Sequence, residues 1–235
     1  MLLQVVVALV ALAVVQCVPS GSSVYRNISF GSSDYSQYFE KQFSYDQHTP
    51  AGQDKRFHMG PPLAVSIFAG DKTFDKGSGT FPRSEISGKE GVILAANTRY
   101  VIDWNVNIAK YDSRYMFCFM QAFQGGANSG PNVMLRWEEG AYALWNINGG
   151  TSHVRMSGNV QQDLNTWVHW TVDLSIGSSN GHVIVSRNGA VVGKLSGKTG
   201  TNDASFLKLG IYTQHVNNVY NMTTLLSDLT VVEYR

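Results

Sequence analysis

The chain has 235 residues, of which 43% are hydrophobic and 15% are charged, and its formal net charge is +1. This length and hydrophobic content suffice for one domain with a sizeable core. The near-neutral charge excludes a sequence-wide electrostatic attraction to nucleic acid or an acidic membrane, so a polyanionic partner would need a local basic site.

The N-terminal segment, residues 1–17, predicts a secretory signal peptide. An apolar run from Val5 to Val15 is followed by small and polar residues, and this run is too short for a comfortable membrane span. We place cleavage near Cys17 or Val18 and expect a secreted, extracellular protein. Removal of the segment leaves Cys118, inside an apolar run, as the only cysteine, so the mature chain can form no intrachain disulfide.

Residues 18–62 carry the least regular pattern and are expected to form the irregular N-terminal part of a sandwich. The stretch from Asp34 to Pro62 is rich in Tyr, Gln and Ser, which favours loops with one short helix. Two sequons, Asn27-Ile28-Ser29 and Asn221-Met222-Thr223, fit glycosylation of Asn27 and Asn221 in a eukaryotic secretory pathway.

From residue 63 to the C-terminus, short alternating runs separated by Gly, Asn, Ser and Asp clusters predict an all-β sandwich. The clearest part is a meander over residues 167–195, in which Asn188-Gly189 closes a two-residue hairpin. There is no domain linker, so we expect one domain over residues 18–235. The expected strands cover residues 63–68, 83–87, 99–108, 116–123, 132–137, 142–146, 167–176, 182–187, 190–195, 206–214 and 225–234.

Several motifs of metal and nucleophile enzymes are missing from the sequence. It contains no His-Glu-x-x-His pair and no Gly-x-Ser-x-Gly turn, and its 6 histidines are scattered. Glu138 and Glu139 are adjacent, so a strand would point them to opposite faces and not pair them as a retaining glycoside hydrolase requires. We expect this pair at a strand end or turn, and we expect no cofactor in the chemistry, with a structural calcium left open.

Polar side chains recur on one face of three otherwise apolar strands. The expected strand over residues 206–214 contains Leu207-Lys208-Leu209-Gly210-Ile211-Tyr212. Its leucines and isoleucine would enter the core, and Gly210 would leave room for a sugar ring. A buried amide at Gln121 would have to find hydrogen-bond partners. By alternation, the residues that share a face are Arg83 with Glu85, Gln121 with Phe119 and Phe123, and Lys208 with Tyr212 and Gln214.

These groups suit the β-elimination of a uronic acid. Arginine and amide donors can neutralise the uronate carboxylate, which makes the neighbouring C5 proton acidic enough for a phenolate to remove. Because a tyrosine titrates near pH 10 in water, such a base needs a nearby cation, for which Lys208 and Arg83 are the candidates. The plainer alternatives are a half-buried strand tyrosine at Tyr212 and a surface pair of Arg83 and Glu85.

In chain order, Arg83-Ser84-Glu85-Ile86, Gln121 and Lys208-Leu209-Gly210-Ile211-Tyr212 resemble elements of the jelly-roll polysaccharide lyases. Those elements are Arg-Ser/Thr-Glu, Gln-x-His and Lys-x-Gly-x-Tyr. The resemblance is to the glucuronan lyase and heparin lyase I-like group, and more distantly to alginate lyases. It implies a concanavalin A-like two-sheet jelly roll.

The resemblance also assigns roles to residues. It implies that Tyr212 is the base and acid and that Gln121 and Arg83 neutralise the carboxylate. Substrate-binding residues would be Lys208, Glu85, Gln214 and Phe123.

One position departs from the family pattern. The second residue after Gln121 is histidine in the family, and here it is Phe123. Three alternatives follow: another histidine enters the site, Tyr212 carries both proton transfers, or the site no longer turns over. The candidate histidines are His58, His153 and His215.

We therefore expect a secreted, monomeric lyase that cleaves a 1,4-linked polyuronate of the glucuronan or alginate type. A highly sulfated substrate would favour more Lys and Arg than this chain carries. We expect neither nucleic acid nor a membrane as partner. The alternatives are a non-catalytic, lectin-like carbohydrate-binding protein on the same fold and a structural component of the extracellular matrix.

Overall fold

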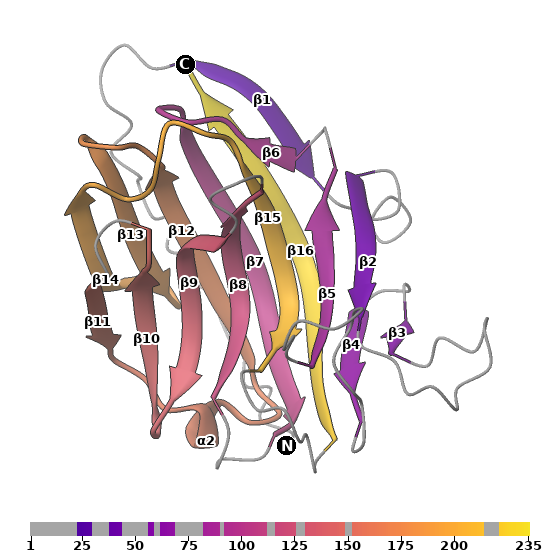
Figure 1. Cartoon of the computed structure of the whole chain (residues 1–235). Coiled ribbons are helices and arrows are strands. Elements are labelled where there is room, and N and C mark those ends of the chain that lie inside the picture. The colour runs from indigo at the N-terminus through magenta and orange to yellow at the C-terminus, as the bar shows by residue number, and fades with distance from the viewer. Residues whose placement is uncertain are drawn as a thin grey trace, which may run out of the picture.

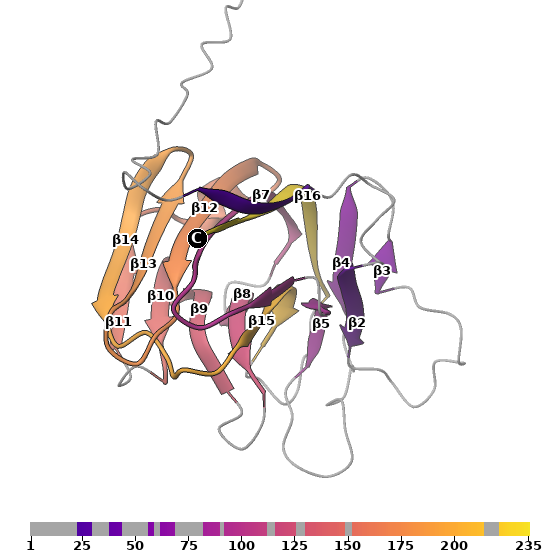
Figure 2. The same cartoon turned by 90° about the horizontal axis from the view of Figure 1, so that it is seen from above.

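The computed structural model describes residues 23–29, 38–43, 56–58, 62–68, 82–89, 92–111, 116–125, 130–148, 152–213 and 221–235. The predicted signal peptide, Gln214 and His215 lie outside these residues. Two antiparallel sheets pack face to face (Figure 1), and the view from above shows the two layers (Figure 2). The predicted all-β, single-domain sandwich is therefore confirmed.

The first layer, which we call the β7 sheet, follows the order β14-β13-β12-β7-β16-β4-β3, and β1 pairs with β16. Its strands are β1 (Val24–Ser29), β3 (Phe57–His58), β4 (Leu63–Ile67), β7 (Arg99–Lys110), β12 (Trp167–Ser175), β13 (Gly181–Arg187), β14 (Ala190–Gly197) and β16 (Met222–Tyr234).

The second layer, which we call the β15 sheet, follows the order β11-β10-β9-β8-β15-β5-β2, and β6 pairs with β15. Its strands are β2 (Phe39–Phe43), β5 (Arg83–Gly88), β6 (Ile93–Leu94), β8 (Phe117–Gln124), β9 (Gly130–Glu138), β10 (Ala141–Asn146), β11 (Ser152–Met156) and β15 (Ser205–Tyr212). A short helix, α2 (Val160–Asp163), precedes β12. Among the described residues, no helix is long and apolar enough to cross a membrane.

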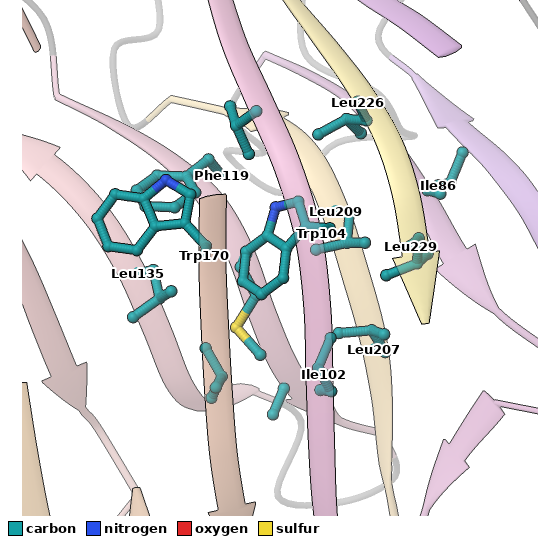
Figure 3. Close-up of a cluster of buried hydrophobic side chains, with 14 of the residues drawn as sticks. Ile86, Ile102, Trp104, Phe119, Leu135, Trp170, Leu207, Leu209, Leu226 and Leu229 are labelled. Atoms are coloured by element: carbon teal, nitrogen blue, oxygen red, sulfur yellow. The ribbon is translucent and has the colours of Figure 1, made fainter. Parts of the chain in front are cut away.

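The core fills the space between the sheets because both layers alternate apolar and polar side chains. In β12, Val168, Trp170 and Val172 are buried, and the residues between them face outward. The ring of Trp170 packs 5.2 Å, centroid to centroid, from Phe119 of the opposite sheet (Figure 3). Leu207 and Leu209 enter the same cluster, as the alternation of β15 predicted.

Three strands occur in residues 18–62, the part expected to be irregular, and two of them, β2 and β3, lie in the stretch predicted to form loops and a helix. β1, β2 and β3 lie between residues 24 and 58, and β1 pairs with β16 along its length. In β1 only Ile28 is buried, because this strand lies at an edge. The sequence of β1 therefore shows only a weak apolar pattern. Asn27, a predicted glycosylation site, is exposed on this strand, and Asn221 is exposed just before β16.

A β-bulge in β8 corrects one prediction. Alternation placed Phe119, Gln121 and Phe123 on one face, but Phe119 and its neighbour Met120 are both part of the core. The pairing with β9 shifts by one residue between Cys118 and Met120, which is the signature of an extra residue in the strand. Gln121 and Phe123 therefore face outward, and so does Cys118.

Candidate active site

The register of the β15 sheet arranges the predicted site residues in rows that cross the strands on its outer face, the face away from the core. The row that we call the Tyr212 row contains Arg83, Tyr212, Cys118, Arg136, Ala143 and Arg155. The adjacent row, the Lys208 row, contains Ser87, Lys208, Gln121, Met134, Trp145 and His153. Residues from β5, β8 and β15 that are far apart in sequence thus become neighbours, as the resemblance implied.

Glu85 is the centre of a buried polar cluster. It is 1% exposed, and Gln121 donates a hydrogen bond of 2.5 Å from Nε2 to its Oε1. Arg83 approaches the other carboxylate oxygen, with 3.9 Å between NH1 and Oε2. Burial raises the pKa of Glu85, and the charges of Lys208 and Arg83 and the bond from Gln121 oppose this effect. The amide of Gln121 therefore has the partner that its burial requires.

Lys208 lies against Phe123, the residue that stands where the family pattern has histidine. The ammonium nitrogen is 4.1 Å from the centroid of the Phe123 ring, a cation–π geometry. Lys208 is only 4% exposed. Burial lowers the pKa of Lys208, and the charge of Glu85 opposes this effect. Phe123 thus contributes an aromatic face that holds a cation and no group that can transfer a proton.

Tyr212 ends β15 and is partly exposed, and it lies directly opposite Arg83 on β5. The guanidinium carbon of Arg83 is 5.0 Å from the centroid of the Tyr212 ring. A positive charge therefore lies against the ring of Tyr212.

Gly210 has a backbone role that differs from the one we predicted. Its φ is +140°, and a Cβ at this position would lie 2.4 Å from the carbonyl oxygen of Ser84 and 2.8 Å from Cα of Glu85. The close approach of β5 therefore requires glycine here, whether or not a sugar ring passes over it. The pairing of β15 with β8 also shifts between Leu209 and Tyr212, so Gly210 lies within a bulge.

The structure does not bring the described candidate histidines to Tyr212. His58 lies on β3 of the opposite sheet, and His153 lies on β11, four strands from β15. His153 instead stacks on Trp145, with 4.7 Å between ring centroids. His215 and the predicted substrate-binding residue Gln214 lie outside the described residues.

Several residues of this face were not predicted from the sequence. Arg136 is 6% exposed, and its guanidinium carbon lies 4.8 Å from the centroid of the Trp145 ring. The Trp145 indole donates a 2.9 Å hydrogen bond from Nε1 to Glu138, which stands at the end of β9, and Glu139 follows in the turn. The alternation of Arg136 and Glu138 with the apolar residues Leu135 and Trp137 on β9 was the available signal.

Cys118 also faces the polar cluster. Its thiol donates a 3.0 Å hydrogen bond to the carbonyl oxygen of Met120, and burial, reinforced by the charge of Glu85, holds its pKa well above the ordinary value. A thiol of this kind is a poor nucleophile. Among the described residues, no group of three or more His, Cys, Asp or Glu side chains could hold a metal ion.

The fold is similar to those of solved alginate lyases. Alginate lyase A1-II', a member of polysaccharide lyase family 7, has a TM-score of 0.65 and 15% sequence identity, over 86% of this chain and 96% of that chain. Alginate lyase PA1167 from Pseudomonas aeruginosa has a TM-score of 0.62 and 16% identity, over 83% and 97%. Alginate lyase AlyC3 in complex with dimannuronate has a TM-score of 0.59 and 14% identity, over 84% and 89%.

No protein-family model matches the sequence, and no curated protein matches it significantly. At these identities the similarity shows the fold, a jelly roll shared with family 7 alginate lyases. It supports the alginate lyase part of the resemblance, which the sequence had placed as the more distant one. It gives no specific support for the glucuronan and heparin lyase group.

Proposed function

We propose that the protein is a secreted, monomeric polysaccharide lyase that cleaves a 1,4-linked polyuronate of the alginate or glucuronan type, with Tyr212 as base and acid. The observation that carries the proposal is the position of Tyr212: it is under the guanidinium of Arg83 and one row from the buried cluster of Glu85, Gln121 and Lys208. The jelly-roll similarity to alginate lyases supports the reaction class.

The proposed reaction is a β-elimination that needs no external reactant. Arg83, Gln121 and Lys208 donate hydrogen bonds to the uronate carboxylate and stabilise the negative charge that develops next to it. The Tyr212 phenolate takes the proton from C5, and the electron pair of that bond forms the C4–C5 double bond. The C4–O4 bond breaks, and the departing oxygen takes the proton from Tyr212, which regenerates the phenolate.

A single proton-transfer group has a stereochemical consequence. If Tyr212 both removes the C5 proton and delivers a proton to O4, the two must lie on the same face of the sugar ring. This holds for D-mannuronate and D-glucuronate, whereas in L-guluronate they lie on opposite faces. We therefore propose that mannuronate or glucuronate blocks are cleaved in preference to guluronate blocks.

The test is the ultraviolet absorbance of the unsaturated uronate product, measured on mannuronate, glucuronan and guluronate polymers. Tyr212→Phe, which removes one hydroxyl, should abolish the signal. Tyr234→Phe is the matched control, because Tyr234 lies under Arg99 in the opposite sheet at 4.8 Å. Activity that survives Tyr212→Phe would refute the mechanism.

A second function, a non-catalytic carbohydrate-binding protein, is favoured by Phe123 in place of the family histidine. It predicts measurable binding of a polyuronate with no product absorbance on any of the three polymers. In that case Tyr212→Phe would alter only affinity.

A further inference from the structure

The Tyr212 row continues across the sheet as a line of arginines. Arg83, Arg136 and Arg155 stand on β5, β9 and β11, and the small residues Cys118 and Ala143 fill the positions between them. Adjacent strands are about 4.8 Å apart, so Arg155 lies about 19 Å across the face from Tyr212. Arg155 is exposed, whereas Arg136 is buried under its neighbours.

At the β9–β11 end of the sheet, planar side chains of the Lys208 row stack on one another and on Arg136. Arg136 contacts the Trp145 ring from β9, and His153 stacks on it from β11 with an interplanar angle of 15°. Glu138 accepts the indole hydrogen bond and lies 3.8 Å from Nε of Arg136. The indole is therefore held from three directions, and the imidazole of His153 remains exposed.

We propose that the β9–β11 end of the outer face is a distal subsite for an acidic sugar of the same polymer chain, with Arg155 and His153 as its contact residues. This proposal rests on the proposed function. Arg155 offers a planar, charged fork for a carboxylate. The exposed face of His153 offers a flat surface for the sugar ring, and Arg136, Trp145 and Glu138 act as positioning residues.

The charge balance of this end suits an anion. Arg136 and Arg155 carry two positive charges, and Glu138, which accepts the hydrogen bond of the Trp145 indole, carries one negative charge. Glu138 is already engaged by the indole and lies close to Arg136. Arg155 is exposed on β11, in line with Tyr212, where its charge can hold a remote part of a bound chain.

The experiment uses the Tyr212→Phe protein, so that bound sugar is not cleaved. Isothermal titration with mannuronate oligomers of increasing length should show affinity that rises until the chain is long enough to reach β11. Arg155→Ala and His153→Ala should each weaken binding of the long oligomers by about tenfold. Neither change should affect the affinity for the shortest oligomer. The control is Lys194→Ala, which removes an exposed cation on β14 of the opposite sheet and should change the affinity for neither the short nor the long oligomers.

In the active protein, Arg155→Ala should raise KM for the polymer and leave kcat unchanged, because the lost contact is equal in ground and transition states. Cleavage with no dependence of affinity on Arg155 would overturn the subsite and leave the lyase intact. Binding that weakens with Arg155→Ala, without any cleavage by the wild type, would support the subsite and refute the lyase. A wild-type protein that neither binds nor cleaves would overturn both.

Discussion

Gln121 and Glu85 form a buried pair in which the amide donates and the carboxylate accepts, at 2.5 Å. This bond fixes the orientation of the amide and commits one N–H of Gln121 to the carboxylate. It also joins β8 to β5 across the intervening strand β15. The pair thus links the geometry of the site to the stability of the sheet.

Glu85→Gln keeps the size of the side chain and removes its charge. Because the charge of Glu85 opposes the lowering of the Lys208 pKa, this pKa should fall further, and the alkaline limb of kcat/KM should move to lower pH. The unfolding free energy should fall by about 1–3 kcal/mol. Glu40→Gln is the control, since Glu40 is exposed and is a weaker influence on Lys208. Equal alkaline limbs in the two variants would contradict the claim that the charge of Glu85 supports the pKa of Lys208.

Gly210→Ala should destabilise the protein by about 3 kcal/mol or more, through backbone strain and a clash with β5. Gly140 provides a matched control, because its φ is +80° but a Cβ added there would meet no atom within 4 Å. Gly140→Ala should therefore cost only about 1 kcal/mol of strain. Chemical denaturation of both variants measures the difference. Equal losses would show that the approach of Ser84 and Glu85 does not constrain position 210.

We predict that Asp173, on β12 of the β7 sheet, makes an acid-sensitive contribution to the unfolding free energy. Arg99 donates hydrogen bonds to it of 2.9 and 2.8 Å, and His182 lies 3.0 Å away. Partial burial works to raise the pKa of Asp173, but the bonds from His182 and Arg99 outweigh it and hold this pKa below its ordinary value. A carboxylate whose pKa is lower in the folded than in the unfolded protein stabilises the fold at pH values above its unfolded-state pKa. This contribution disappears as the pH falls through its folded-state pKa.

Asp173→Asn should therefore lower the unfolding free energy by about 1–3 kcal/mol at neutral pH. The difference from the wild type should close as the pH falls through the lowered pKa of Asp173, because both proteins then lack the charge. Urea denaturation between neutral pH and strong acid measures it. A difference that stays constant over this range would mean that the carboxylate charge is not the stabilising element.

Phe123→His should extend the range of substrates. It places an imidazole beside Lys208, and elimination from L-guluronate requires a second proton-transfer group because its C5 hydrogen and O4 lie on opposite ring faces. Guluronate cleavage should rise relative to mannuronate cleavage. Phe123→Leu is the control for loss of the cation–π contact, worth about 1 kcal/mol. An unchanged ratio in Phe123→His would refute the explanation of the wild-type preference.

Local alternation predicted the faces of β12 and β15 because each inward side chain in these strands is apolar. It failed in β8, where Phe119 and Met120 both point inward, since the bulge depends on pairing with β9 and β15 and leaves no mark in the strand itself. It also missed β1, in which only Ile28 is buried. Elements whose stability comes from a partner strand are thus the ones that a single sequence hides.

The site shows the same division. Gln121 was recognisable as a polar residue in an apolar strand, and Tyr212 was recognisable as part of a motif. Arg136 and Arg155 were not, because their connection to Tyr212 exists only through the register of successive strand pairs. No spacing along the chain encodes a row that crosses a sheet.

The place of β15 in its sheet is asymmetric. On one side β5 and β2 follow it, with the short strand β6 beside its first residues, and on the other side β8, β9, β10 and β11 follow in turn among the described strands. In the proposed lyase, a polymer laid across all these strands would leave two fragments after the bond breaks, and the one on the wide side would cover more strands. The fragment on the narrow side would therefore leave first, so the strand order would determine the sequence of product departure.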